Sequence, residues 1–124
     1  MNVQPMLDGG TLYGMGQDGD FFAIDVLSGD RIWTTAWPLG ERRVRTGSAF
    51  MVRHQDRYFM FTEDGDLVIS KLSTLGHEEI DRAHLLEPTN VAFGRSVVWS
   101  APAFANKRVY LRNDKECICV DLAK

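Results

Sequence analysis

The chain has 124 residues, of which 44% are apolar, and its seven Phe, three Tyr and three Trp are enough for the core of one folded domain. Charged residues make up 25% and the formal net charge is -3, which excludes the broad positive field of a protein that binds nucleic acid or an anionic membrane. No stretch approaches the ~18 apolar residues of a membrane helix, so we expect no membrane insertion, and residues 1–5 lack the features of a signal peptide.

Strand-like alternation begins at the N-terminus and continues through most of the chain. The segments are short, rich in aromatic and β-branched residues, and separated by turn residues such as Asp18-Gly19 and Asp64-Gly65. Two groups of four strands are predicted, near residues 3–7, 11–16, 20–26 and 31–36, and then near 47–53, 57–62, 66–72 and 78–82.

A third group of strands is predicted near residues 99–104, 108–113 and 116–122, and it has no fourth member. Residues 83–98 separate it from the second group and contain Pro88 and Gly94. We interpret this segment as a long connection rather than a strand pair, with a short turn of helix near residues 83–87.

An aromatic residue, an acidic turn and a third position recur with nearly fixed spacing. The aromatic residues Tyr13, Phe59 and Tyr110 precede the turns, the turns contain Asp18, Asp64 and Asp114, and seven residues further stand Asp25, Lys71 and Asp121. From Asp18 to Asp64 and from Asp64 to Asp114 the distances are 46 and 50 residues, the period of four-stranded β-propeller blades. A β-sandwich has similar strands but does not repeat one turn in register.

The sequence therefore predicts an all-β fold, a partial β-propeller of about three four-stranded antiparallel blades with the last incomplete. We expect one propeller-type domain over residues 1–124, with blade units at about 2–36, 46–82 and 99–124 and the connection at 83–98. Three blades do not close a ring, which takes four to eight. We therefore expect the C-terminal part of a larger propeller, or a fragment that assembles edge to edge, because open edge strands pair with other chains.

Residues 23–33 read Ala-Ile-Asp-Val-Leu-Ser-Gly-Asp-Arg-Ile-Trp. This segment resembles the A-x-D-x-x-T/S-G-x-x-x-W signature of the pyrroloquinoline-quinone-like propeller repeats of quinoprotein dehydrogenases. The resemblance implies that Trp33 docks between neighbouring blades and that Asp25 and Gly29 shape the turn that allows it. The second unit matches partially, with Lys71 for the Asp and Ile80 near where a docking Trp would stand.

Two sets of residues follow from the repeats and the loops. Positions predicted to build the blades are Tyr13, Asp18, Gly19, Ala23, Asp25, Gly29, Trp33, Asp64, Gly65, Tyr110, Asp114 and Asp121. Positions predicted as a possible binding surface are Trp37 in the Trp37-Pro38 turn, the cluster Arg42, Arg43 and Arg45, and the 83–98 connection. Loops on a rigid scaffold tend to carry recognition.

No catalytic, cofactor-binding or metal-ligating residue is predicted. The glycines at 14, 16 and 19 match G-x-G-x-x-G, but a strand pattern follows them where a dinucleotide site needs a helix. The acidic turns have the sequences of tight hairpin turns and are not predicted to bind calcium. His54, His77 and His84 lack the spacing of metal ligands, and we expect them at the surface or in turns. Cys117 and Cys119 would share one face of a strand, too far apart for a disulfide, and we expect them to pack like small apolar residues.

The leading hypothesis is a non-catalytic propeller module that acts as a binding or assembly scaffold. Its partners would be proteins bound through edge strands or loops, by self-association or as additional blades of a parent chain. The alternative is the C-terminal segment of a quinone-dependent dehydrogenase, whose quinone and calcium would require residues of further blades. Propellers of this type also resemble a scaffold lipoprotein of outer-membrane protein assembly, which implies a periplasmic or secreted location.

Overall fold

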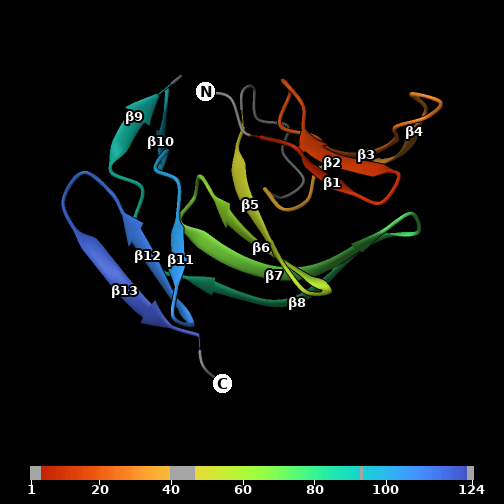
Figure 1. Ribbon diagram of the computed structural model, residues 1–124. Helices are drawn as coiled ribbons and strands as arrows, with labels where there is room; N and C mark the ends of the chain where they lie inside the picture. The colour runs from red at the N-terminus through yellow and green to blue at the C-terminus, as the bar shows by residue number, and fades with distance from the viewer. Residues whose placement is uncertain (1–3, 40–46, 93, 123–124) are drawn as a thin grey trace.

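The computed structural model describes residues 4–39, 47–92 and 94–122, and within them every regular element is a β-strand (Figure 1). Thirteen strands form four antiparallel sheets in these ranges. None of the described segments forms a helix that could cross a membrane.

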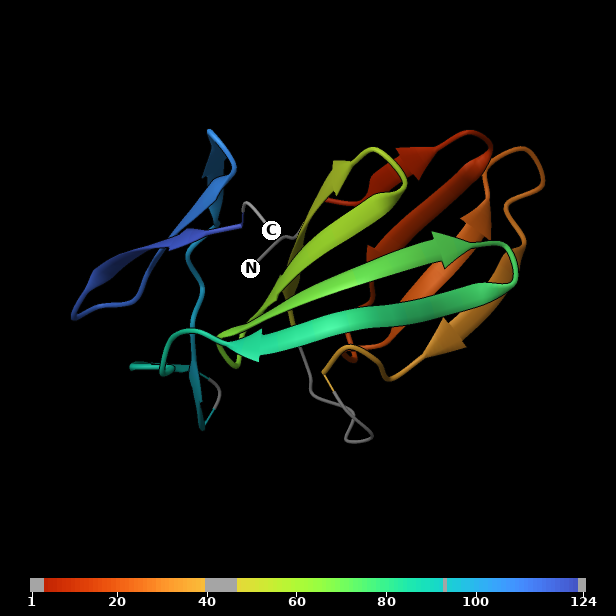
Figure 2. The same cartoon turned by 90° about the horizontal axis from the view of Figure 1, so that it is seen from below.

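The three larger sheets are meanders in which neighbouring strands follow one another along the chain. The first sheet contains β1 (Met6–Asp8), β2 (Thr11–Met15), β3 (Phe21–Asp25) and β4 (Arg31–Thr35). The second contains β5 (Ala49–His54), β6 (Arg57–Thr62), β7 (Asp66–Ser73) and β8 (Gly76–His84). The third contains β11 (Ala103–Ala105), β12 (Arg108–Arg112) and β13 (Cys117–Asp121). Figures 1 and 2 show them side by side in chain order.

The repeated turn joins the second and third strands of each of these sheets. In the first sheet the amide of Gly16 donates to the carbonyl of Asp20 at 2.7 Å, and in the third the amide of Asn113 donates to the carbonyl of Glu116 at 3.0 Å. The G-x-G-x-x-G segment is thus a hairpin between β2 and β3. Gly65 in the second sheet has φ +89° and faces the carbonyl of Leu86, where a Cβ would collide.

The expectation for residues 83–98 was wrong in two respects. Strand β8 continues to His84, and a fourth sheet pairs β9 (Asn90–Ala92) with β10 (Arg95–Val97). Residues 83–87 do not form a helical turn, because the amides of Leu85 and Leu86 both donate to the carbonyl of Gly65 and Leu86 is buried in the core. Three-residue strands are too short to show alternation in a sequence.

Two cores lie between successive sheets. The first joins Tyr13, Phe21 and Ala23 of the first sheet to residues of the second sheet that include Tyr58 and Met60. The second core joins the second sheet to the third, and its buried members are Phe61, Leu67, Leu86, Val98, Val109 and Leu111. The second sheet is therefore covered on both faces.

Both long hairpins that end a sheet contain a β-bulge. Ala23 pairs with Trp33 while Ile24 pairs with Arg31, so Ile32 is the extra residue, and in the second sheet Ile69 pairs with Asp81 and Ser70 with Glu79, so Ile80 is extra. Ile80 thus stands next to the place expected for a docking Trp and not at it. Asp81 has that position, and Ile80 corresponds to Ile32.

The two cysteines lie on β13 as free thiols and both are exposed. Their predicted packing as small apolar residues was wrong, because the side chains that enter the second core from β13 are Ile118 and Val120, which alternate with them. Cys117 and Cys119 lie on the opposite face of the third sheet.

Candidate functional site

A hollow of about 500 Å³ lies where the chain leaves the first sheet and passes the second. Its walls are residues 35–39 together with Asp64, Asp66 and Arg82. Trp37, which the sequence analysis named as a possible binding residue, is part of this wall.

Trp37 is held in place by both neighbouring sheets. Its ring stacks on the His77 imidazole with centroids 4.3 Å apart and planes 12° apart, and it contacts the edge of Phe21 at 5.7 Å. The indole Nε1 donates a hydrogen bond to Oε1 of Glu79 at 3.0 Å. The Trp37 ring is thus held in one orientation by contacts with Phe21, His77 and Glu79.

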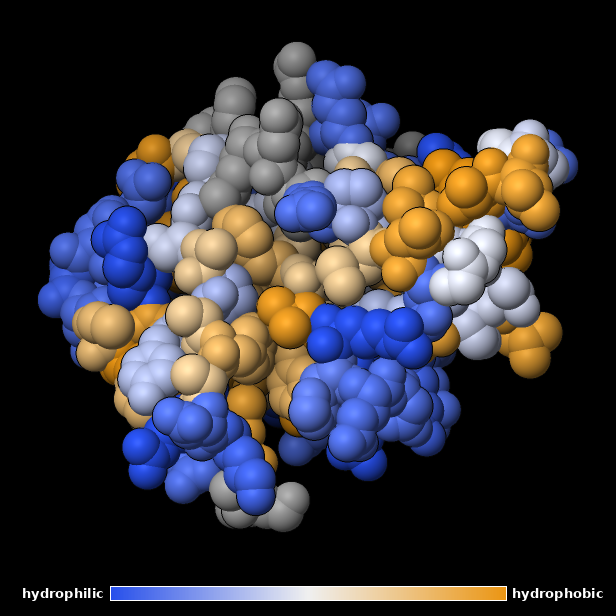
Figure 3. All heavy atoms as spheres, viewed as in Figure 1, coloured by the Kyte–Doolittle hydropathy of each residue, from blue (hydrophilic) through white to orange (hydrophobic). Residues whose placement is uncertain are grey.

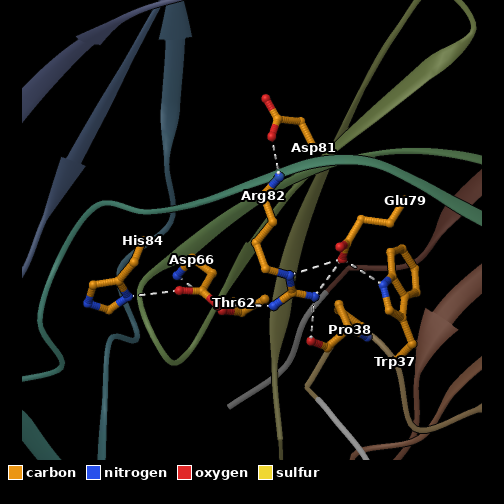
Figure 4. Close-up of polar contacts among 8 residues, drawn as sticks. All are labelled: Trp37, Pro38, Thr62, Asp66, Glu79, Asp81, Arg82 and His84. Atoms are coloured by element: carbon orange, nitrogen blue, oxygen red, sulfur yellow. Dashed lines mark hydrogen bonds and ion pairs between the residues drawn. The ribbon is translucent and has the colours of Figure 1, made fainter.

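A continuous set of charged contacts runs from Trp37 along β8, and we call it the β8 ladder (Figure 4). Arg82 donates from Nε to Glu79 Oε1 at 3.0 Å and from Nη2 to the same oxygen at 2.8 Å. Its Nη1 donates to Asp66 Oδ2 and its Nη2 to the carbonyl of Pro38, both at 3.0 Å. His84 completes the ladder, with Nδ1 at 2.8 Å from Asp66 Oδ1 and Nε2 at 2.8 Å from Glu87 Oε1.

Contacts within the ladder shift the pKa values of Glu79, Arg82 and His84 toward their charged forms. Hydrogen bonding to Arg82 is the main reason that the pKa of Glu79 is lowered. Desolvation opposes the charge on Arg82, yet its hydrogen bonds to Glu79 and Asp66 raise the pKa of the guanidinium overall. Hydrogen bonds to Asp66 and then to Glu87 raise the pKa of His84.

Two groups beside the ladder shift toward their neutral forms. Burial lowers the pKa of the His77 imidazole, against the opposing effect of Glu79. Burial, followed by repulsion from Glu63 and Asp66, raises the pKa of Asp64. The hollow therefore combines one stacked neutral aromatic pair with a network of paired charges.

Sequence reasoning missed the ladder because of the bulge at Ile80. In a regular strand residues 79 and 81 share a face and residue 82 points to the other side. The extra residue reverses this alternation, so that Glu79 and Arg82 meet although they are three residues apart. Only a signal for the bulge itself could have revealed this pairing.

A second polar cluster joins the second sheet to β10. Glu63, whose side chain is 3% exposed, accepts hydrogen bonds from Arg95 Nε at 3.1 Å, from Arg95 Nη2 at 3.0 Å and from Trp99 Nε1 at 3.0 Å. The backbone carbonyl of Glu63 also accepts from the amide of Val98 at 2.7 Å. This carboxylate is fully engaged in holding the 83–98 segment.

The remaining predicted positions lie in turns and between sheets. Trp33 donates from Nε1 to the carbonyl of Ser73 at 2.8 Å, across the gap between the first two sheets. Asp25 Oδ1 accepts from the amides of Leu27 and Ser28, inside the turn that contains Gly29. Arg42, Arg43 and Arg45 lie outside the described residues.

A smaller hollow of about 330 Å³ lies between the β5–β6 turn and the β11–β12 turn. Phe59 and Phe104 contact each other in its wall at 5.6 Å, and Lys107 and Arg108 also line it. Arg53, another lining residue, is paired with Asp8 at 3.0 Å. Apart from Asn106, the residues that line this hollow are apolar or basic, and they do not form a pair of a nucleophile and a general base.

The carboxylates near the larger hollow do not fit a quinone-enzyme metal cradle. Over residues 4–39, 47–92 and 94–122 no group of three or more His, Cys, Asp or Glu is placed to hold a metal ion. Glu63 is bound by Arg95 and Trp99, and Asp66 by Arg82 and His84. Their lone pairs point at cationic or N–H groups of the chain itself.

The fold is that of part of a pyrroloquinoline-quinone-like β-propeller. It is all-β, and successive meander sheets pack face to face with the repeated turn in register. Three solved structures of this architecture match the chain: BamB from Moraxella catarrhalis, a quinohemoprotein alcohol dehydrogenase from Comamonas testosteroni, and a europium-containing methanol dehydrogenase.

The similarity to these structures lies in the fold, at low sequence identity. The BamB match has a TM-score of 0.54 and 17% identity, covering 89% of this chain and 28% of that one. The alcohol dehydrogenase match has a TM-score of 0.56 and 16% identity, covering 88% of this chain and 16% of that one. The methanol dehydrogenase match has a TM-score of 0.58 and 16% identity, covering 95% of this chain and 22% of that one. The chain thus spans less than a third of each structure. No protein-family model and no curated protein matches the sequence.

Proposed function

We propose that this chain is a non-catalytic β-propeller module that acts as a binding or assembly scaffold for proteins. The observation that carries the proposal is uncovered apolar surface on the outermost sheets. Leu7, Val26 and Ile32 of the first sheet and its turn are 59%, 50% and 37% exposed. Figure 3 shows apolar residues over the part of the view where Figure 1 places this sheet. Large exposed apolar patches mark interaction sites.

The β8 ladder supports a structural use of its charges. Its side chains hydrogen-bond one another and the carbonyl of Pro38, and through Trp37 they tie the end of the first sheet to β8. A scaffold needs such rigid positioning of its sheets, whereas catalysis needs groups free to meet a substrate. The resemblance to propeller proteins of the periplasm leads us to expect a periplasmic or secreted location.

The alternative function is a segment of a quinone-dependent dehydrogenase, which the match to two dehydrogenase structures favours. Titrating the purified chain with pyrroloquinoline quinone and calcium tests whether this chain by itself holds the cofactor. We expect no shift in melting temperature and no dye-linked oxidation of an alcohol, since a bound ligand would stabilise the folded state. A saturable rise in melting temperature would overturn the scaffold proposal.

Position-specific photo-crosslinking tests the binding role directly. A photoreactive phenylalanine analogue at Leu7 should give discrete protein adducts in cells that produce the chain. The same residue at Leu75, which is 97% exposed at the β7–β8 turn, is the matched control and should give few. Equal labelling at both positions would contradict a dedicated protein-binding surface.

A further inference from the structure

The hollow between the β5–β6 turn and the β11–β12 turn, which we call the turn hollow, has an apolar interior. Its apolar lining residues are partly buried, and they are Val52, Phe59, Phe104 and Leu122. The rings of Phe59 and Phe104 meet at 5.6 Å, so a large side chain that enters from outside would contact two aromatic rings. The volume of about 330 Å³ lies at the lower end of the range for ligand pockets.

Among the residues that the structure describes, every charged side chain that lines the turn hollow is basic. Arg53, Lys107 and Arg108 are exposed there, and the exposed His54 lies with them. Asp121 pairs in register with Arg108 but does not line the hollow. The chain as a whole has a net charge of -3, so this concentration of basic groups is a local feature. Such a surface attracts an anionic group.

The corresponding place between the first and second sheets is filled by a carboxylate. Asp8, the last residue of β1, accepts a hydrogen bond from the Tyr58 hydroxyl at 2.8 Å and lies 3.0 Å from Arg53 Nη1. By strand register Val109 of the third sheet corresponds to Tyr58, and His54 corresponds to Asp8. The gap between the second and third sheets therefore lacks both the tyrosine and the carboxylate that fill the first gap, which accounts for the hollow.

The turn hollow lies between two described sheets and not on an end face of the stack. Leu122 in its wall donates from its amide to the carbonyl of Lys107 at 2.8 Å, just as the amide of Val26 in the first sheet donates to the carbonyl of Gly10 at 3.0 Å. After Val26 the chain turns back along β3 as β4. A fourth strand that followed β13 in the same way would pair with the free edge of β13, and the hollow would stay open.

The β11–β12 turn holds a lysine in a conformation that suits glycine. Asn106 and Lys107 have φ values of 52° and 60°, which lie in the left-handed region. Asparagine adopts this region more readily than lysine does, and the corresponding turn of the first sheet consists of Gly9 and Gly10. The lysine therefore costs stability at this position, and a role for its ammonium group at the hollow would explain that cost.

We propose that the turn hollow binds a segment of a partner protein in which an apolar side chain is adjacent to carboxylate side chains. This inference rests on the proposed scaffold function and gives it a defined site and a ligand chemistry. The apolar side chain lies against Phe59 and Phe104, and a carboxylate lies beside Lys107 and Arg108, as a carboxylate lies beside an arginine in the first gap. The rings supply the desolvated contact, and the exposed charges supply selectivity for an acidic partner.

Peptide titration monitored by two-dimensional NMR of the full chain tests this chemistry. The probe is the unlabelled peptide acetyl-Gly-Ser-Phe-Asp-Asp-Ser-Gly-amide. Replacing both of its aspartates by asparagine, or its phenylalanine by alanine, should each weaken binding at least about fivefold. Binding of the parent peptide should also weaken as sodium chloride rises from about 50 to about 300 mM, because the basic groups are exposed. A parent peptide that binds no more tightly than its asparagine version would overturn the proposal.

The same spectra locate the site. Amide signals of residues 52–59, 104–108 and 122 should shift on binding, because these residues line or flank the hollow. Amide signals of the first sheet outside β1 should stay in place. Shifts confined to another part of the chain, or no saturable shift up to about 2 mM peptide, would overturn the proposal.

The variant Lys107→Gly separates binding from stability. Glycine adopts the left-handed conformation without strain, so the melting temperature should stay the same or rise while peptide binding weakens. Adding Arg108→Gln should bring the loss of affinity to at least about fivefold. The matched control combines Arg112→Gln with Lys115→Gln, which removes two exposed charges at the other end of β12 and should leave binding unchanged. Equal binding by the two double variants would contradict the proposed site.

The peptide experiments and the crosslinking at Leu7 fail independently. Protein adducts at Leu7 from a chain that does not bind the peptide would overturn the turn-hollow inference and leave the scaffold function standing. Peptide binding at the turn hollow without adducts at Leu7 would support the inference and remove the first-sheet surface from the scaffold proposal.

Discussion

The indole of Trp33 connects the last strand of the first sheet to the second sheet by a hydrogen bond across the gap. Trp33→Phe keeps an aromatic ring but removes the donor to the Ser73 carbonyl. We expect the free energy of unfolding to fall by about 1 kcal/mol. Urea denaturation measures the loss, and Ile32→Val, at the neighbouring bulge residue, should change stability by less than about 0.5 kcal/mol. Equal losses of stability in Trp33→Phe and Ile32→Val would show that the Trp33 hydrogen bond does not stabilise the fold.

His77 and His84 should give opposite pH dependences of stability. The pKa of His84 is raised above its ordinary 6.5, so its contribution is present below that value and is lost as pH rises through the folded-state pKa. The pKa of His77 is lowered below 6.5, so its contribution is present above 6.5 and is lost as pH falls toward the folded-state pKa.

Two variants separate these effects. His77→Phe keeps the stacking on Trp37, and relative to the parent chain its stability should rise less as pH increases from about 5 to about 7, the range below and around the ordinary pKa. His84→Gln keeps a polar partner for Asp66, and relative to the parent chain its stability should rise more steeply as pH increases from about 6 to about 8. Both effects should stay below about 1 kcal/mol, because the ion pairs are partly exposed. Chemical denaturation at several pH values provides the measurement, and identical profiles would contradict the assignments.

At the level of elements, the β9–β10 hairpin depends on a buried carboxylate. Glu63→Gln leaves the Arg95 guanidinium without its counter-charge, and we expect a loss of about 2 kcal/mol. This is less than for a fully buried pair, because the Arg95 side chain is 24% exposed. In the Glu63→Gln variant, hydrogen exchange at the Val98 amide, which donates to the Glu63 carbonyl, should also accelerate. Asp64→Asn, at the adjacent exposed position, is the control and should leave that amide protected.

Alternation predicted the strands of the first and third sheets because each of those sheets has one face in a core and the other outside it. The second sheet is covered on both faces, and its strands were predicted from short apolar runs between turn residues. Neither pattern could predict β9 and β10, which are three residues each, nor the β8 ladder, which depends on a bulge. Trp37 was identified from its loop position alone. Its partners Glu79 and Arg82 were not, because their meeting is a property of the strand pairing. The exposure of Cys117 and Cys119 depends on what lies beyond the third sheet, which no local pattern encodes.

At the level of the whole molecule, the sheets are stacked in one dimension and each contacts only its neighbours. The second sheet is the one covered on both faces. We therefore expect the amides of β6 and β7 to exchange more slowly than those of β2, β3, β12 and β13 when the chain is dilute enough to be monomeric. Exchange mass spectrometry tests this, and uniform protection of all three sheets would contradict a linear stack.

The bulge at Ile80 divides β8 into two parts. Before the bulge the side chains of odd-numbered residues such as Glu79 point toward the first sheet, and after it those of even-numbered residues such as Arg82 do. Substitutions on β8 therefore change the chemistry of a position but not its direction. Deletion of Ile80 would leave Glu79 and Arg82 on one face, because Ser70 would still pair with Glu79 and Ile69 with Asp81. Insertion of one further residue at Ile80 would instead turn Arg82 and His84 to the other face while Glu79 kept its place. The hollow beside Trp37 is thus more open to remodelling by a change of length than by a change of side chain.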